Sequence, residues 1–265
     1  MNLLLETAIT AALKAGEEIL RIYHNPESDF GIEHKADNSP LTVADRKSNE
    51  IIIDYLTTTS YPVISEENKA IAFEIRRQWK TVWIIDPLDG TKEFIKRNGE
   101  FTVNIALVRN GTPVLGVIYI PVRKTLYYGC ENKAFRVEHV VYSPDLDFSK
   151  IQEKALCLPV GHPGSSCIVV ASRSHMSSET EKFIDELRLQ KGKVELTSIG
   201  SSIKICLVAE GSADIYPRFA PTMEWDTAAG HAIAKAAGKE IYQMDGITPL
   251  AYNKENLLNP WFVVK

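Results

Sequence analysis

Carboxylates follow several apolar segments of this sequence at the points where those segments end. The run Val82-Trp83-Ile84-Ile85 leads directly into Asp86-Pro87-Leu88-Asp89-Gly90-Thr91, and Glu66-Glu67 follow a second strand-like run at 62–65. Asp226 stands at the start of a helical pattern near the end of the chain. Because α/β folds place functional side chains at strand ends, we expect these carboxylates to contribute to one site.

The types of these residues indicate which metal such a site would hold. The segment 86–91 is no EF-hand loop, because Leu88 stands at the third position, where an oxygen ligand is needed, and Gly90 is fifth instead of sixth. No histidine or cysteine lies close by in sequence, which argues against zinc or iron. Carboxylates with a turn carbonyl suit Mg²⁺, which keeps waters and accepts phosphate oxygens.

Each acidic residue also has a structural interpretation. An aspartate between a strand and a glycine is usually part of a solvated turn. Asp226 alone would most often be a helix N-cap, and Asp45, three residues after Thr42, is typical of a capping box. The functional interpretation depends on the combination of these residues.

Composition sets limits on the class of protein. The 265 residues are 45% hydrophobic and 24% charged, as in ordinary globular proteins. The formal net charge of −4 argues against a nucleic-acid polymer as partner, since binding its phosphates needs a basic surface. Four cysteines form no CxxC pair, and there is neither a signal-peptide pattern nor an apolar run of about 18 residues. We therefore expect a cytoplasmic protein.

Periodicity predicts a chain in two parts. Helical spacing of apolar residues predicts helices over 5–23 and from Thr42 onward, and alternating runs then predict strands. These expected strands are 62–65, 81–85, 101–108, 113–120 and 125–130, with the later ones forming an antiparallel meander. After a Pro/Ser/Gly-rich stretch at 140–165, strands at 168–171, 193–197 and 213–216 alternate with helices at 177–190, 200–210 and 226–237. We predict an α+β metal-binding part, 1–145, and an α/β part, 146–265, that completes the site within one compact unit.

Several motifs in order give the chain a strong family resemblance. Asp86-Pro87-Leu88-Asp89-Gly90-Thr91, with Glu66-Glu67 upstream and Trp225-Asp226 downstream, resembles the inositol monophosphatase superfamily of Mg²⁺-dependent, lithium-sensitive phosphatases. Further segments resemble its bacterial 3′(2′),5′-bisphosphate nucleotidase branch: 35–40, 90–97, 172–175, 200–204 and 216–219. The resemblance covers nearly the whole chain and is weakest at 131–166. It implies a layered αβαβα sandwich of the inositol monophosphatase/fructose-1,6-bisphosphatase type.

The resemblance also implies roles for the acidic residues and Thr91. Glu66, Asp86 and the Leu88 carbonyl would bind one Mg²⁺, and Asp86, Asp89 and Asp226 would bind a second. Thr91 and Asp45 would orient and deprotonate the attacking water, while Glu67 would accept from water or support Glu66. Such a reaction needs these groups, because a phosphate monoester dianion repels hydroxide and its charge must be neutralised during an in-line attack.

A further group of residues is implied to select the substrate. Ser201, Lys204 and Arg218 would hold a 5′-phosphate, and His175 would contact the base or ribose. The alternatives are a helix cap for Ser201, solvated surface charges for Lys204 and Arg218, and no role for His175. The full set of expected substrate contacts is Glu66, Asp89, Gly90, Thr91, Lys92, His175, Ser201, Lys204, Arg218 and Asp226.

The expected activity is hydrolysis of the 3′-phosphate of adenosine 3′,5′-bisphosphate to AMP and phosphate. The sulfated relative of that nucleotide, an intermediate of sulfur metabolism, is a second expected substrate. The alternatives are an inositol or sugar phosphate phosphatase of the same superfamily and a nucleotide-binding module without turnover. The intact set of site residues argues against the module, which has no use for a water-activating pair. The expected partner is thus a small nucleotide bisphosphate, and any contact with the inner membrane would be peripheral.

Overall fold

The computed structural model describes residues 2–25, 30–34, 40–161, 166–172 and 177–265. Two long helices open the chain, α1 (Leu3–Tyr23) and α2 (Val43–Leu56), as the periodicity predicted. The side chain of Asn2 caps α1 by accepting from the N–H groups of Leu4 and Leu5. Gly16 lets α1 lie close to the sheet beneath it, since a Cβ there would stand 2.5 Å from the Tyr119 ring.

A seven-stranded sheet follows, in the order β3-β4-β5-β6-β7-β8-β9. Strand β3 is parallel to β4 and all other neighbours are antiparallel, which confirms the predicted meander. The strands are β3 (Val63–Ser65), β4 (Thr81–Asp89), β5 (Thr102–Arg109), β6 (Thr112–Ile120), β7 (Thr125–Cys130), β8 (Lys133–Val137) and β9 (Leu156–Cys157). The sequence did not predict β8 or β9, and it ended β4 four residues early.

The second half alternates helices and strands as predicted, but one strand is shifted and two strands near the end of the chain were not predicted. Strands β10 (Cys167–Ser172) and β11 (Val194–Ile199) are parallel, and α6 (Ser178–Lys191) connects them. The strand expected at 213–216 begins only at its last residue, as β12 (Tyr216–Arg218), while Ile215 bridges to Val169. Two unpredicted strands, β13 (Ile241–Gln243) and β14 (Phe262–Val264), complete a sheet in the order β12-β14-β13. The helices between them are α7 (Ile203–Glu210) and α8 (Glu224–Ala236).

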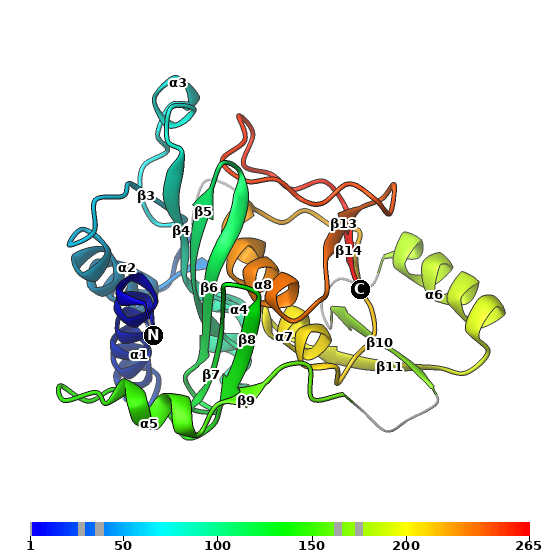
Figure 1. Ribbon diagram of the computed structural model, residues 1–265, viewed down its shortest axis with the longest axis horizontal. Coiled ribbons are helices and arrows are strands. Elements are labelled where there is room, and N and C mark those ends of the chain that lie inside the picture. Colours follow the sequence, from blue (N-terminus) through cyan, green and yellow to red (C-terminus); the bar gives the residue numbers. More distant parts are fainter. Residues whose placement is uncertain (1, 26–29, 35–39, 162–165, 173–176) are drawn as a thin grey trace.

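These elements form five layers that confirm the αβαβα sandwich (Figure 1). Helices α1 and α2 cover one face of the seven-stranded sheet, α7 and α8 cover the other, the smaller sheets follow, and α6 lies outermost. The remaining elements are short: β1 (Glu33–His34), β2 (Pro40–Leu41), α3 (Phe73–Arg76), α4 (Thr91–Ile95) and α5 (Phe148–Glu153). The division into residues 1–145 and 146–265 stays a prediction; β9 follows that expected boundary and completes the first sheet.

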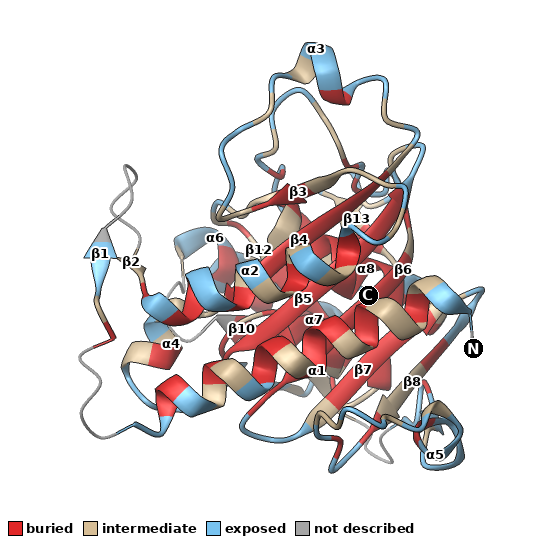
Figure 2. Cartoon of the chain, turned by 90° about the vertical axis from the view of Figure 1, so that its left-hand side faces the viewer, coloured by how far each residue is buried: buried red, intermediate tan, exposed pale blue. Residues whose placement is uncertain are grey.

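Strand β4 is buried on both faces, which explains its continuous apolar sequence. Trp83 and Ile85 belong to the core beneath α1 and α2, and Val82 and Ile84 belong to the core beneath α7 and α8. Burial extends along the central strands in Figure 2. The approach of α8 is close, because a Cβ on Gly116 would lie 2.2 Å from the Ala229 carbonyl oxygen. Helices therefore cover both faces of β4.

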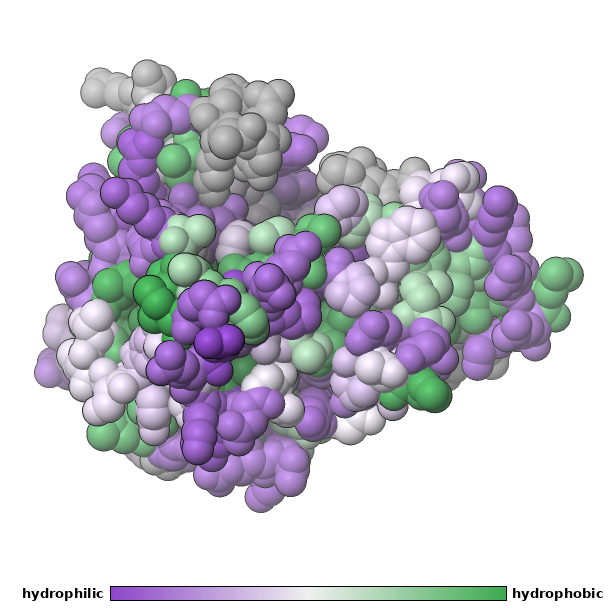
Figure 3. Space-filling model, turned by 90° about the horizontal axis from the view of Figure 1, so that it is seen from above, coloured by the Kyte–Doolittle hydropathy of each residue, from purple (hydrophilic) through white to green (hydrophobic). Residues whose placement is uncertain are grey.

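Among the described residues, no helix combines the length and apolar character that crossing a membrane requires. The face seen from above, toward which α3 projects, mixes hydrophilic side chains with smaller hydrophobic groups (Figure 3).

Candidate active site

Three carboxylates from separate elements meet at the end of β4. Glu66 directly follows β3, Asp86 lies in β4, and Asp226 is the third residue of α8. Each offers a carboxylate oxygen, and these oxygens lie within 4.8 Å of one another. The parallel pairing of β3 and β4 accounts for part of this meeting, since the Glu66 N–H donates to the Ile85 carbonyl at 3.3 Å. The tertiary packing of α8 supplies the third group.

The electrostatics of this cluster favour a bound cation. Burial raises the pKa of Asp86 well above its usual value, and the negative charges of Glu66, Asp89 and Asp226 raise it further. Burial likewise raises the pKa of Asp226, with Asp89 and Glu66 adding to the effect. A divalent cation would remove this repulsion. Because all three donors are carboxylate oxygens, the set fits a hard ion.

The turn that carries the cluster is held by local hydrogen bonds. The Leu88 N–H donates to Asp86 Oδ1 at 3.1 Å, and Ser48 Oγ donates to the Pro87 carbonyl at 2.6 Å. The Asp226 carboxylate accepts from the Met223 N–H at 2.8 Å. Asp226 therefore stands one turn inside the helix start, which corrects the N-cap interpretation.

Asp89 is turned toward α7 and is not a member of the group of three. Its Oδ2 accepts from the Ser202 N–H at 2.6 Å and from Asn104 Nδ2 at 3.3 Å, and Thr102 Oγ1 lies 3.4 Å away. These three partners were not predicted from the sequence. Thr102 and Asn104 carried a signal, because they are polar residues inside an otherwise apolar strand. They fix Asp89 beside the cluster, where its charge acts on Asp86 and Asp226.

Thr91 and Asp45 form the pair that the sequence suggested. Thr91 Oγ1 lies 3.1 Å from Asp45 Oδ1 and 3.3 Å from the Leu88 carbonyl oxygen, so it can donate to either. Gly90 has φ 94° and allows this tight turn from β4 into α4. The predicted capping box is present, since Asp45 Oδ2 accepts from the Thr42 N–H at 2.7 Å. Burial raises the pKa of Asp45 to about 6, against the lowering effect of the Thr42 and Thr91 donors.

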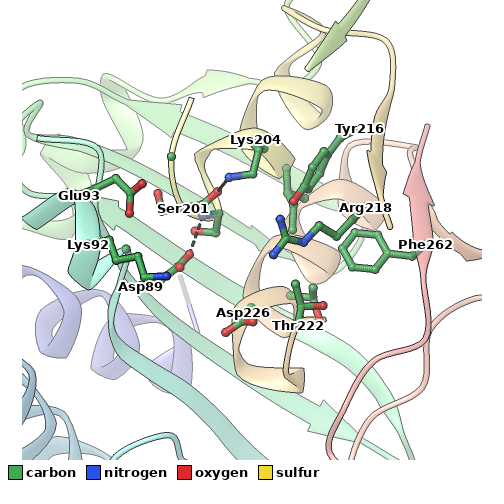
Figure 4. Close-up of a pocket in the computed structure, with 15 residues that line it drawn as sticks. Asp89, Lys92, Glu93, Ser201, Lys204, Tyr216, Arg218, Thr222, Asp226 and Phe262 are labelled. Carbon is green, nitrogen blue, oxygen red and sulfur yellow. Dashed lines mark hydrogen bonds between the residues drawn. The ribbon is translucent and has the colours of Figure 1, made fainter. Parts of the chain in front are cut away.

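A polar cavity of about 140 Å³ adjoins the cluster. Figure 4 shows Asp89 and Asp226 on its walls together with Lys204 and Arg218, whose guanidinium points into the space. Gly90, Lys92 and Ser201, three of the predicted substrate contacts, also line this cavity. The other lining residues were not predicted as substrate contacts from the sequence: Glu93, Gly200, Ser202, Ile205, Tyr216, Thr222, Thr227 and Phe262.

The two cations of this cavity differ in exposure and partners. Lys204 is only 6% exposed, and its Nζ donates to the carbonyls of Ser201 at 2.6 Å and Ile199 at 3.2 Å. Burial lowers the pKa of Lys204 to about 8. Arg218 donates from Nη2 to the Pro221 carbonyl at 3.2 Å, while its buried Nε has no hydrogen-bond partner among the described residues. The surface-charge alternative is therefore wrong for Lys204.

Two parts of the expected site lie outside the described residues. These are His175, with the neighbouring 173–174, and most of the motif at 35–40. The cap interpretation of Ser201 is wrong, because Ser202 is the N-cap residue of α7; Ser201 Oγ lies 3.5 Å from the Ile203 nitrogen.

Comparisons with known proteins place the chain in one family and find relatives with two different names within it. Residues 1–260 match the inositol monophosphatase family. The 3′(2′),5′-bisphosphate nucleotidase CysQ of Salmonella typhimurium is 45% identical over 263 residues, which cover 98% of this chain and 99% of the relative. The crystal structure of CysQ from Bacteroides thetaiotaomicron superposes with a TM-score of 0.91 at 59% identity, covering 98% and 96% of the two chains. An inositol monophosphatase from Thermotoga maritima shares the fold, with a TM-score of 0.70 at 21% identity.

Proposed function

The chain belongs to the inositol monophosphatase family, and we propose that it is a 3′(2′),5′-bisphosphate nucleotidase that converts adenosine 3′,5′-bisphosphate to AMP and phosphate. Relatives named for this activity are 45% identical over nearly their whole length. The observation that carries the proposal is the cavity in which Asp89 and Asp226 stand opposite Lys204 and Arg218. A carboxylate cluster beside a cationic subsite suits a substrate with two separated phosphates.

The carboxylate cluster is proposed to bind Mg²⁺. Glu66, Asp86 and the Leu88 carbonyl would hold one ion, and Asp86, Asp89 and Asp226 a second. Bound there, Mg²⁺ would neutralise charge on the reacting phosphate and act as a Lewis acid toward its oxygens. An oxygen of Asp86 lies within 4.8 Å of oxygens of both Glu66 and Asp226, which supports including Asp86 in both ligand sets.

Thr91 and Asp45 are proposed to take the proton of the attacking water. The Thr91 hydroxyl, which reaches Asp45 Oδ1 at 3.1 Å, accepts the water's hydrogen while it donates its own to that carboxylate. With a pKa of about 6, Asp45 is largely ionised at neutral pH and basic enough to accept a proton. The water oxygen bonds to phosphorus as the bond to the 3′-oxygen breaks, and the released 3′-oxygen is protonated from solvent.

Lys204, Arg218 and Ser201 are proposed to hold the 5′-phosphate. The Arg218 guanidinium is a planar fork that matches phosphate oxygens, and its position over the cavity leaves it accessible to a ligand. Lys204 is held by two carbonyls, so it contributes a positioned charge. A phosphate dianion nearby would favour its protonated form. The sulfated relative of the nucleotide keeps both the 3′-phosphate and a 5′ anion and is a proposed second substrate.

The test is phosphate release with Mg²⁺ from adenosine 3′,5′-bisphosphate, 3′-AMP and inositol 1-phosphate. The bisphosphate is expected to give the highest kcat/KM, because only it engages both subsites. Preference for inositol 1-phosphate would favour the sugar-phosphatase alternative. Binding of the bisphosphate without phosphate release would indicate a module that has lost turnover.

A further inference from the structure

A buried arginine outside the site ties two distant segments together. Arg76, the last residue of α3, is 4% exposed although it stands in a short surface helix. Its Nε donates to the Ile71 carbonyl at 2.9 Å, which closes the loop before α3. Its Nη1 donates to Asn253 Oδ1 at 2.9 Å and to the Lys254 carbonyl at 2.7 Å. Its Nη2 donates to the Glu255 carbonyl at 2.9 Å.

Asn253 donates a hydrogen bond back to Arg76 and has a left-handed backbone conformation. Its Nδ2 donates to the Arg76 carbonyl at 2.8 Å, so the two residues bond reciprocally. Its φ of 58° lies in the left-handed region, which asparagine and glycine tolerate better than other residues. The segment 253–255 is therefore shaped to present its carbonyls to the guanidinium. In Figure 1 this orange-red segment lies in the upper part of the molecule, near α3.

The same segment is held from its other side by Glu224, the first residue of α8. The Glu224 side chain is fully buried and accepts from the N–H groups of Asn253 and Lys254 and from Lys254 Nζ. The Lys254 ammonium forms an ion pair with the Glu224 carboxylate and so compensates its buried charge. We call this set, Arg76, Asn253, Lys254, Glu255 and Glu224, the Arg76–Glu224 clasp.

The ends of the clasp lie next to two carboxylates of the candidate metal site. Glu224 is two residues before Asp226 at the start of α8. On the other side, Arg76 holds Ile71, which leaves only residues 67–70 between the clasp and Glu66. Glu66 and Asp226 come from different layers, yet their oxygens lie within 4.8 Å of each other and of Asp86. The clasp is a direct bridge between the segments that carry them.

We infer that the Arg76–Glu224 clasp positions Glu66 and Asp226 for metal binding, with Arg76 as a positioning residue that touches neither metal nor substrate. The inference rests on the proposed Mg²⁺ site. Two like charges brought together repel, so the metal-free cluster tends to open unless its segments are held. By holding them, the clasp preforms the site and lowers the free-energy cost of assembling it around the ion. Residues hydrogen-bonded directly to metal ligands typically change metal affinity by about 10- to 100-fold, and the clasp, which acts through the intervening chain, is expected to act at the lower end of that range.

The test is calorimetric titration of Mg²⁺ into the metal-free full-length protein, without substrate. Arg76→Gln removes the guanidinium and its hydrogen bonds to residues 253–255, and we expect its Mg²⁺ affinity to fall by about tenfold. Asn253→Gly keeps the left-handed backbone but removes the reciprocal side-chain bonds, and we expect a smaller fall. The matched control is Arg77→Gln, because Arg77 is the next residue, is exposed and forms a local ion pair with Glu74 at 3.1 Å. It is expected to bind Mg²⁺ like the wild type.

Two further measurements separate positioning from a general structural role. The rate at saturating Mg²⁺ is expected to stay within about threefold of wild type in Asn253→Gly, while the Mg²⁺ concentration for half-maximal rate rises. The double variant is expected to lose less affinity than the sum of the single losses, because both residues act in one contact. Variants that unfold at lower temperature without metal but bind Mg²⁺ with wild-type affinity would overturn the inference. If Arg76→Gln fails to fold, the Mg²⁺ affinity of Asn253→Gly alone tests the inference, and wild-type affinity in that variant would overturn it. Failure of the wild type itself to bind Mg²⁺ would reject the proposed metal site as well.

Discussion

Replacing Asp86 by asparagine is expected to stabilise the metal-free protein at neutral pH while abolishing its response to Mg²⁺. Asp86 is 2% exposed and stands beside Glu66 and Asp226, with oxygens of all three within 4.8 Å. Asparagine has nearly the same shape and can still accept the Leu88 N–H through Oδ1, as Asp86 does at 3.1 Å. The substitution therefore removes a charge with little change in packing.

The magnitude follows from the geometry of the cluster. At 4.8 Å and an effective dielectric constant of about 20, two unit charges interact by about 3 kcal/mol. Asp86 has two such neighbours, but its raised pKa means that the native cluster relieves part of the repulsion by keeping a proton. We expect Asp86→Asn to raise the free energy of unfolding by about 2–4 kcal/mol near pH 7.5.

The sign of the pH dependence follows from the same pKa. Because the folded-state pKa of Asp86 is raised, the native state binds this proton more tightly than the unfolded state. The stability it contributes is fully present below the unfolded pKa of about 4 and is lost as the pH rises through the folded pKa. The advantage of Asp86→Asn is therefore expected to be small near pH 4 and to grow toward neutral pH.

Urea unfolding with a chelator, at pH 4 and 7.5, measures this difference, and a second series with Mg²⁺ measures the metal response. A ligand at 100 times its dissociation constant stabilises by about 2.7 kcal/mol, which wild type should gain and the variant should not. A variant that is less stable than wild type in chelator at pH 7.5 would refute the account of three repelling carboxylates.

Four further predictions concern the reaction. Thr91→Val should lower kcat by about 10²–10⁴ while Mg²⁺ binding in calorimetry persists, and loss of the metal instead would contradict the proton-relay role. Asp45→Asn should lower kcat similarly, and the double variant should lose little more; additive losses would show that the two act separately. The wild-type rate should rise with pH through about 6 as Asp45 ionises, and a rise that survives in Asp45→Asn would assign it to another group. Arg218→Gln should reduce kcat/KM for adenosine 3′,5′-bisphosphate by about 10- to 100-fold yet spare 3′-AMP. Equal losses on both substrates would indicate that Arg218 supports the fold or the overall electrostatic potential of the site and does not bind the 5′-phosphate specifically.

The strands that could not be predicted from the sequence either lack a glycine turn or are very short. The run 133–137 was missed although it is a full strand, because two left-handed residues, Glu131 and Asn132, form its turn without a glycine. Strands β13 and β14 have three residues each, too few for an alternation to be recognised. Their positions depend on pairing with each other and with β12.

The sequence by itself determined the long helices, the central strands, the capping box at Thr42 and the motif from Asp86 to Thr91. These features depend on residues a few positions apart, so their patterns can be recognised in the sequence. The family resemblance came from the same local motifs in order. It also indicated which carboxylates to consider together, but not how they contact one another.

Only the tertiary structure decided the environment of those residues. The proximity of Glu66, Asp86 and Asp226 depends on how α8 packs against the sheet, and the raised pKa of Asp86 follows from the burial that this packing creates. Lys204 became a buried cation, and Arg76 proved to be bonded to residues 177–179 positions away. Burial and long-range contacts are properties of the packed chain as a whole, because no local pattern states which distant segment will cover a side chain.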